Sequence, residues 1–356
     1  MTGTDDNGTN LREPNDREGT ASMKKSLTTL IAGAALAAAF ATSAAAETLR
    51  LEWIIQGQFA GPLMALENGW YKEAGVDIEL VPAGPDIKPA VTVAQGSDTF
   101  GIGHPNQIIA ARSNGAPLVM VSQYGQKSVT TYIARKSSGI TSINDMKGRS
   151  VGLWFGGDEQ EFLAMLAKAG IDQGDVKIVS QGYDIVGWLN GDYEVMQVTL
   201  YNELQQVYAQ GIKKEDLVFI DASEQDLAMV STGLFTTEKT ITEKPEAVQA
   251  VVDATLRGWQ AALADPEKAA EVVVKYNSEL NAAEQVAQIK AMGELFCTGP
   301  TLKGEFGISV LKDWETVQAI LLDAKLIDAP IDLTKAFTNA FWEKAPAAYK
   351  TIPCAG

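Results

Sequence analysis

Residues 51–80 read LEWIIQGQFAGPLMALENGWYKEAGVDIEL, and this stretch decides the fold. A strand-like apolar run at 49–54 leads into a helical pattern over 60–74, which ends at Gly75, a residue suited to a helix C-terminus. Val76–Val81 then alternates like a strand and stops at Pro82. This order of strand, helix and strand predicts the beginning of a largely parallel sheet covered by helices.

The same alternation continues along the chain. Further strands are predicted at 99–103, 118–122, 131–135, 150–155, 176–180, 194–199 and 217–221, and helices at 87–95, 105–114, 159–169, 185–189 and 202–210. Beyond Val230 the pattern is helical, with helices predicted at 245–264, 266–276, 282–295, 309–324 and 333–343. The chain is therefore expected to form two α/β units followed by a helical tail.

Residues 23–46, MKKSLTTLIAGAALAAAFATSAAA, have the three parts of a secretory signal peptide. Lys24 and Lys25 form a basic start, 27–40 is apolar, and Ala44–Ala46 offers small residues for cleavage. The apolar run is too short and alanine-rich to favour a spanning helix. The predicted cleavage point lacks a cysteine, so a lipid anchor is not expected. We expect cleavage near Ala46 and a mature protein in the periplasm. Residues 1–22 are polar and are left out of the fold argument.

Composition narrows the function classes. The chain has 46% hydrophobic and 21% charged residues, as a globular protein does, and a formal net charge of −16. The acidic excess argues against binding to nucleic acid or to an anionic membrane surface, and it also serves plain solubility. The two cysteines, Cys297 and Cys354, are expected to form one disulfide in an oxidising compartment. With one histidine and no Cys-x-x-Cys pair, no metal site is expected.

The stretch 51–80 resembles the start of periplasmic solute-binding proteins of the NMT1/THI5 type. The residues that match the signature of these proteins are Ala65, Gly69, Trp70, Tyr71, Gly75, Val76 and Ile78. Further matches are GSDTFGIGHPNQIIAARSNGAPLVMV at 96–121, INDMKGRSVGLW at 143–154 and KPEAVQAVVDATLRGWQAALADPEKA at 244–269.

The resemblance implies a two-lobe periplasmic binding protein type II fold, α/β, with a mainly parallel sheet flanked by helices in each lobe and a helical C-terminal tail. Lobe 1 would hold 47–130, lobe 2 would hold 131–229, and 230–356 would return to lobe 1. The implied partners are a small-molecule ligand and an ABC transporter permease. The chain would bind without a cofactor, act as a monomer and not be an enzyme.

Ligands of open α/β sheets bind beyond the carboxyl ends of the strands. On that rule the predicted ligand-binding residues are Trp53, Gln58, Phe59, His104, Asn106, Tyr124, Trp154, Phe155, Gly156, Asp158, Tyr183, Asp184, Tyr201, Asn202 and Glu203. Aromatic, amide and carboxylate side chains dominate this set, and it contains no Arg or Lys. Such a set favours a neutral or cationic nitrogen heterocycle, held by ring faces and polar edges, of the type of a thiamine-precursor pyrimidine.

Other interpretations stay open for individual residues. Trp53 could belong to the core. Tyr201-Asn202-Glu203 could form the start of a helix and have no contact with a ligand. His104 could be a loop residue that is hydrogen-bonded to the backbone. Gly156-Gly157 could let backbone N–H groups approach a sulfonate, nitrate or other small anion, which keeps an anion receptor as an alternative.

An enzyme is the alternative from another class. The family resemblance extends to pyrimidine synthases that act on pyridoxal phosphate and use a Lys and a His four residues apart. The matching positions here are His104 and Ile108, so the Schiff-base lysine is missing. The cysteine-rich run of those enzymes is replaced by LAMVS at 227–231. No G-x-S-x-G hydrolase motif occurs. A role as an extracellular scaffold is not favoured, because the loops after the strands are predicted to form a ligand pocket.

Overall fold

The computed structural model describes residues 46–354. Apart from Ala46, the predicted signal peptide lies outside the described residues. Within 46–354, no helix combines the length and the apolar character that crossing a bilayer requires.

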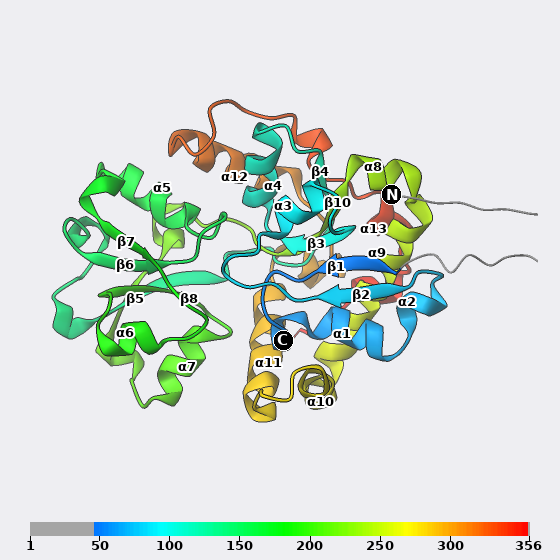
Figure 1. Ribbon diagram of the computed structural model, residues 1–356, viewed down its shortest axis with the longest axis horizontal. Helices are drawn as coiled ribbons and strands as arrows, with labels where there is room; N and C mark the ends of the chain where they lie inside the picture. Colours follow the sequence, from blue (N-terminus) through cyan, green and yellow to red (C-terminus); the bar gives the residue numbers. More distant parts are fainter. Residues whose placement is uncertain (1–45, 355–356) are drawn as a thin grey trace, which may run out of the picture. The chain divides into compact units, whose positions relative to one another are not determined.

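The first sheet has five strands in the order β2-β1-β3-β10-β4 (Figure 1). Its strands are β1 (Glu47–Arg50), β2 (Ile78–Val81), β3 (Phe100–Gly103), β4 (Leu118–Gln123) and β10 (Gly233–Thr237). β1 is parallel to β2 and β3, whereas β10 is antiparallel to β3 and β4. Every residue of β3 and β4 is buried, which fits a sheet covered on both faces. We call the elements around this sheet lobe 1.

The second sheet repeats this design with five strands in the order β7-β6-β8-β5-β9. Its strands are β5 (Thr130–Arg135), β6 (Ser150–Leu153), β7 (Lys177–Ser180), β8 (Val195–Thr199) and β9 (Leu217–Ile220). β6 is parallel to β7 and β8, and β5 is antiparallel to β8 and β9. In each sheet the reversed strand is the first one after a crossing from the other sheet. The predicted fold class, two mainly parallel sheets flanked by helices, is confirmed. We call the elements around this sheet lobe 2.

In the described part of the chain, helices flank both sheets (Figure 1). Those of lobe 2 are α5 (Gln160–Lys168), α6 (Val186–Asn190) and α7 (Glu203–Ala209). Those of lobe 1 are α1 (Ala60–Glu67), α2 (Trp70–Glu73), α3 (Pro89–Ala94), α4 (Pro105–Ser113), α8 (Glu238–Glu243), α9 (Pro245–Ala264), α10 (Pro266–Tyr276), α11 (Ala282–Phe296), α12 (Leu311–Asp323) and α13 (Ala340–Lys344).

Helix α9 packs closely on α1 through two glycines. A Cβ at Gly258 would lie 2.0 Å from the carbonyl oxygen of Gly61, and a Cβ at Gly61 would meet the ring of Trp259. Trp259 also packs edge-on against Phe296 of α11, with 4.9 Å between ring centroids. The helical tail is thereby part of the core of lobe 1.

The structure differs from the sequence-based elements in three places. The helix predicted over 60–74 is divided into α1 and α2 because Gly69 has a left-handed φ of 70°. The strand β10 and the helix α8, at 233–243, were not predicted. The helix predicted over 333–343 is a short turn followed by α13.

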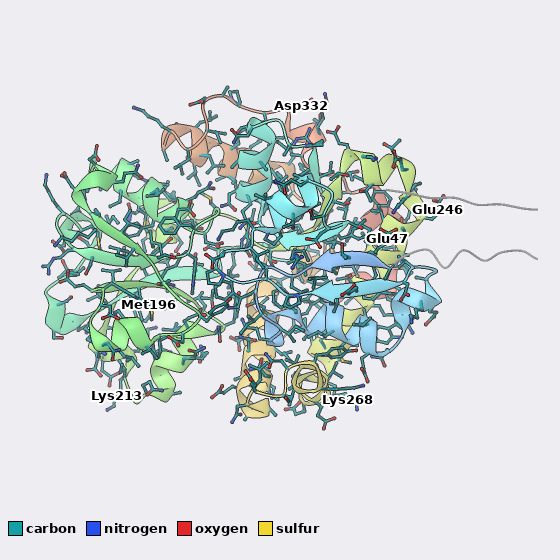
Figure 2. The ribbon with its side chains drawn as sticks, viewed as in Figure 1. Glu47, Met196, Lys213, Glu246, Lys268 and Asp332 are labelled. Carbon is teal, nitrogen blue, oxygen red and sulfur yellow. A yellow bond between two sulfur atoms is a disulfide. The ribbon has the colours of Figure 1, made fainter. Side chains whose placement is uncertain are left out.

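The predicted disulfide between Cys297 and Cys354 is present and joins the end of α11 to the last described residue. The start of β1 is also held by the tail, since Lys244 Nζ lies 2.6 Å from Glu47 Oε1. Figure 2 shows Glu47 beside the start of α9, where Glu246 lies. Both ends of the described chain are thus fixed to lobe 1.

Candidate functional site

A cavity that encloses about 710 Å³ of space, part of it open to solvent, lies between the two lobes. Its lobe 1 wall contains Glu52 and Trp53 after β1, Gly84 and Lys88 after β2, and His104 directly after β3. Its lobe 2 wall contains Trp154 and Asp158 after β6, Thr199 and Tyr201 at the end of β8, and Val129 and Thr130 at the start of the reversed strand β5. The cavity therefore lies where open α/β sheets bind their ligands.

Aromatic rings from both lobes meet at this cavity. The centroid of Trp53 lies 5.8 Å from that of Trp154 in an edge-on arrangement, and 5.0 Å from that of Tyr183. Trp154 is fixed in lobe 2, because its indole Nε1 donates to the Gly182 carbonyl at 2.9 Å and its backbone N–H donates to Gln197 Oε1 at 3.0 Å. The cavity thus presents flat apolar faces, one of them firmly oriented.

Glu52, His104 and Asp158 form a charged cluster in the cavity. His104 Nε2 lies 2.9 Å from Glu52 Oε1. Burial lowers the pKa of His104, but the nearby carboxyls, Glu52 foremost, together outweigh burial and raise that pKa to about 9. Burial, reinforced by the nearby Glu52 charge, raises the pKa of Asp158 to about 7. At neutral pH the cluster therefore holds an ion pair beside a carboxyl that can exchange a proton.

The same three side chains are the donors that could hold a metal ion. One ligand atom from each lies within 4.8 Å of the others, and an imidazole with two carboxylates suits several divalent metals. In this structure the imidazole nitrogen and a carboxylate oxygen face each other as an ion pair.

Two glycines shape the lobe 2 wall. Gly156 and Gly157 have φ values of 109° and 122°, a region that side chains rarely allow. A Cβ at Gly157 would lie 2.5 Å from Gln107 Cγ of lobe 1, and one at Gly156 would meet the side chain of Lys88 at 2.5 Å. These glycines let the lobes approach each other, and Lys88 Nζ donates to the Phe155 carbonyl across the junction.

Side chains of α11 hold the loop that carries Gln56 and Gln58. The Gly57 N–H donates to Gln285 Oε1 at 2.7 Å, and the Gln58 N–H donates to Gln288 Oε1 at 3.0 Å. Gln285 and Gln288 are both buried, which is unusual for glutamine on a helix. The C-terminal tail thus positions a ligand loop that lies more than two hundred residues earlier in the chain.

The predicted site residues fall into two groups. Those that line the cavity are Trp53, Gln58, His104, Trp154, Gly156, Asp158, Tyr201 and Glu203. Their part in ligand binding stays a prediction.

The others lie around the cavity. Phe59 is buried beneath it, and Tyr124 lies in the core of lobe 1, stacked on Phe306. Asn106 bridges the lobes through the Gly157 carbonyl at 2.8 Å. The side chains of Phe155 and Tyr183 are exposed.

Two further predicted residues serve local structure. Asp184 accepts from the Val186 N–H at 2.9 Å, and Asn202 donates to Glu203 at 2.6 Å. Glu203 itself accepts from the Thr199 N–H at 3.0 Å, and burial raises its pKa.

Other lining residues were not predicted. They are Glu52, Gln56, Gly84, Ile87, Lys88, Pro89, Ala90, Gln107, Val129, Thr130 and Thr199. The group from 84 to 90 follows β2, and applying the strand-end rule to that strand as well would have found it. It includes Lys88, so the cavity has a cation that the predicted set lacked. Val129 and Thr130 begin the reversed strand β5, whose direction the sequence pattern does not show.

Comparison with known proteins finds both a binding protein and an enzyme that are similar to this chain. It is 24% identical to the riboflavin-binding protein RibY of Chloroflexus aurantiacus over 302 residues, which covers 83% of this chain and 85% of that protein. It is 26% identical to 4-amino-5-hydroxymethyl-2-methylpyrimidine phosphate synthase of Legionella pneumophila over 313 residues, covering 86% and 96%.

Solved structures show the same fold. The alkanesulfonate-binding protein SsuA from Xanthomonas axonopodis pv. citri, bound to MOPS, superposes with a TM-score of 0.63 at 16% identity, covering 83% of this chain and 99% of that one. The family described as NMT1/THI5 like matches residues 56–269, more than half of the chain. The chain therefore belongs to the NMT1/THI5-like family.

Proposed function

We propose that this protein is the extracytoplasmic solute receptor of an ABC importer and binds a small nitrogen heterocycle of the pyrimidine type between its lobes. The observation that carries the proposal is the interlobe cavity, where tryptophans from both lobes meet beside the Glu52, His104 and Asp158 cluster. Ring faces supply area for stacking, and the cluster supplies hydrogen-bond partners for ring nitrogens and amino groups.

The arrangement of the tryptophan rings means that one ring must turn before a heterocycle can stack between them. Two stacked contacts of about 3.5 Å each require parallel faces about 7 Å apart. Trp53 and Trp154 are edge-on, with centroids 5.8 Å apart. A heterocycle between them would therefore turn one ring, and Trp53 is the one that moves, because the indole of Trp154 is hydrogen-bonded within lobe 2.

The polar groups of the cavity favour this ligand over an anion. The carboxyl groups of Glu52, Asp158 and Glu203 line the cavity beside the cations Lys88 and His104, and a carboxyl group can hydrogen-bond a ring nitrogen or an amino group whether it is charged or protonated. His104 is already paired with Glu52, which leaves Lys88 as the partner for an anion. A sulfonate or nitrate would approach Lys88 and the Gly156-Gly157 backbone, and this second candidate is tested beside the first.

An enzymatic role is not part of the proposal. The position that matches the Schiff-base lysine of the synthases is His104, and Ile108 is fully buried in lobe 1. The side chain of Lys88, the lysine at the cavity, is engaged with the Phe155 carbonyl. A receptor needs only binding and closure, and the chain supplies the groups for both.

Ligand capture would close the two lobes around the cavity and create the surface that a permease recognises. The disulfide and the signal-like sequence at 23–46 support a periplasmic location, and we propose that the receptor acts as a monomer.

The test is titration calorimetry on protein that has been unfolded and refolded to remove any carried ligand. We expect binding of riboflavin or of a 4-aminopyrimidine, weakened in Trp53→Ala, and no binding of an alkanesulfonate or nitrate. If the protein instead binds only the sulfonate, and Lys88→Ala abolishes this binding, the ligand is an anion and the heterocycle proposal is wrong. The exposed Lys213 of lobe 2 offers the matched control, Lys213→Ala.

A further inference from the structure

Two crossings join the lobes, and Glu161 of α5 contacts both of them. The first crossing runs from β4 to β5 and the second from β9 to β10. Glu161 Oε2 accepts from the hydroxyl of Ser128 on the first crossing and from that of Thr130, where this crossing enters β5, each at 2.9 Å. Glu161 Oε1 accepts from the Met229 N–H on the second crossing at 2.6 Å. One carboxylate of lobe 2 thus holds both connections.

On the side of lobe 1 the crossings are held to each other and to the tail. The Ser231 N–H of the second crossing donates to the Gly125 carbonyl of the first at 3.2 Å. Gln126 Nε2 donates to the Ile308 carbonyl of the tail at 2.9 Å. Between these contacts and those of Glu161 only a few residues of each crossing are left to bend. A hinge needs such short segments between two firmly held ends.

Glu161 lies close behind the ligand cavity. A smaller cavity of about 290 Å³ is lined by Glu161 and Met229 and shares His104, Thr130 and Asp158 with the main one. Glu161 is only 6% exposed. Burial raises the pKa of Glu161 to about 7, although the hydrogen bonds from Met229, Ser128 and Thr130 oppose this rise. Above that pH the group is a carboxylate whose lost hydration is compensated by strong hydrogen bonds, and its partners belong to the hinge.

We propose that Glu161 is a positioning residue that anchors the hinge to lobe 2 and thereby sets the angle between the lobes. The hydroxyls of Ser128 and Thr130 and the amide of Met229 hold the crossings in one place only while an acceptor stands at this position. Without that acceptor the bending region lengthens, and lobe 2 takes a wider range of orientations relative to lobe 1.

The experiment needs no ligand, so its outcome is independent of the proposed function. Hydrogen exchange at the Met229 amide would be measured in the wild type and in Glu161→Ala, Glu161→Met and Glu161→Gln. Methionine keeps the bulk without an acceptor, whereas glutamine keeps an acceptor for Met229 and can donate to the hydroxyls. Glu224→Gln, at an exposed carboxylate of the same lobe, is the control.

Above pH 7, where Glu161 is a carboxylate, we expect Met229 protection to fall about tenfold or more in the alanine and methionine variants, the size expected when a charge-assisted hydrogen bond is lost. Protection should stay within about threefold of the wild type in Glu161→Gln and Glu224→Gln. Spin labels at the exposed Lys72 and Lys213, after replacement by cysteine, should show a broader distance distribution only in the first two variants.

Wild-type protection and an unchanged distance distribution in Glu161→Met would overturn the proposal, because the acceptor would then be dispensable. If the Glu161 variants fail to fold, Ser128→Ala combined with Thr130→Val removes two donors and leaves the carboxylate in place. That double variant should broaden the distance distribution. An unchanged distribution would show that these hydrogen bonds to Glu161 do not anchor the hinge.

Discussion

The ion pair between Glu52 and His104 gives a quantitative prediction. His104 is the only histidine of the chain, so its titration by NMR is free of overlap from other imidazoles. Its pKa is raised from 6.5 to about 9, although burial alone would lower it. At about 1.4 kcal/mol per pKa unit, the protonated imidazole is favoured by about 3 kcal/mol in the folded protein.

Glu52→Gln removes the charge and keeps the shape. In this variant burial is opposed only by the more distant carboxyls of Asp158 and Glu161, and the His104 pKa should fall toward 6.5 or below. Because the folded-state pKa is raised, the stabilisation is fully present below pH 6.5 and is lost as the pH rises through about 9. Glu52→Gln should therefore cost about 2–3 kcal/mol of unfolding free energy at pH 6.

Denaturant unfolding at pH 6 and pH 10 measures this difference, and the two values should converge at pH 10, where His104 is neutral in both proteins. Glu79→Gln, at an exposed carboxylate of β2 in the same lobe, is the matched control and should leave the His104 pKa unchanged. A wild-type pKa near 6.5, or equal pKa values in wild type and Glu52→Gln, would refute the ion pair as the cause.

Three further predictions concern the cavity and the tail. Trp53→Ala should weaken heterocycle binding in calorimetry by about 1–3 kcal/mol, by analogy with aromatic–base stacking, and equal affinity would remove Trp53 from the site. Gly157→Ala should lower the melting temperature through about 1–3 kcal/mol of backbone strain at a φ of 122°. Gly182→Ala, where a Cβ meets nothing within 4 Å, should not lower it. Replacing Cys297 and Cys354 by alanine opens a loop with a sequence separation of 57. This should lower the free energy of unfolding in guanidinium by about 4 kcal/mol. A wild-type unfolding midpoint that does not change when reductant is added would contradict this.

The alternating strands and helices of the sequence predicted the two sheets and the edge at which the cavity opens. Trp53, His104, Trp154 and Tyr201 were predicted because each follows a strand, and each lines the cavity. The strand β10 was missed because Gly233–Thr237 is a short run without clear alternation. Its place between β3 and β4 depends on pairing with residues more than a hundred positions away.

Several contributions to the site could not come from local patterns. Lys88 reaches the cavity because Gly156 of the other lobe leaves space for its side chain. Tyr124 follows β4 as the rule requires, yet it packs into the core of lobe 1, because the reversed strand β10 separates β4 from β3 and from the cavity edge. The support of the 56–58 loop by Gln285 and Gln288 depends on tertiary packing of the tail.

Native mass spectrometry of the mature protein as purified, repeated after unfolding and refolding, tests the central claim most directly. The account predicts a mass excess that disappears on refolding, corresponds to a small nitrogen heterocycle, and is reduced when Trp53 is replaced by alanine. A bound sulfonate or other small anion, retained in Trp53→Ala and lost in Lys88→Ala, would contradict it.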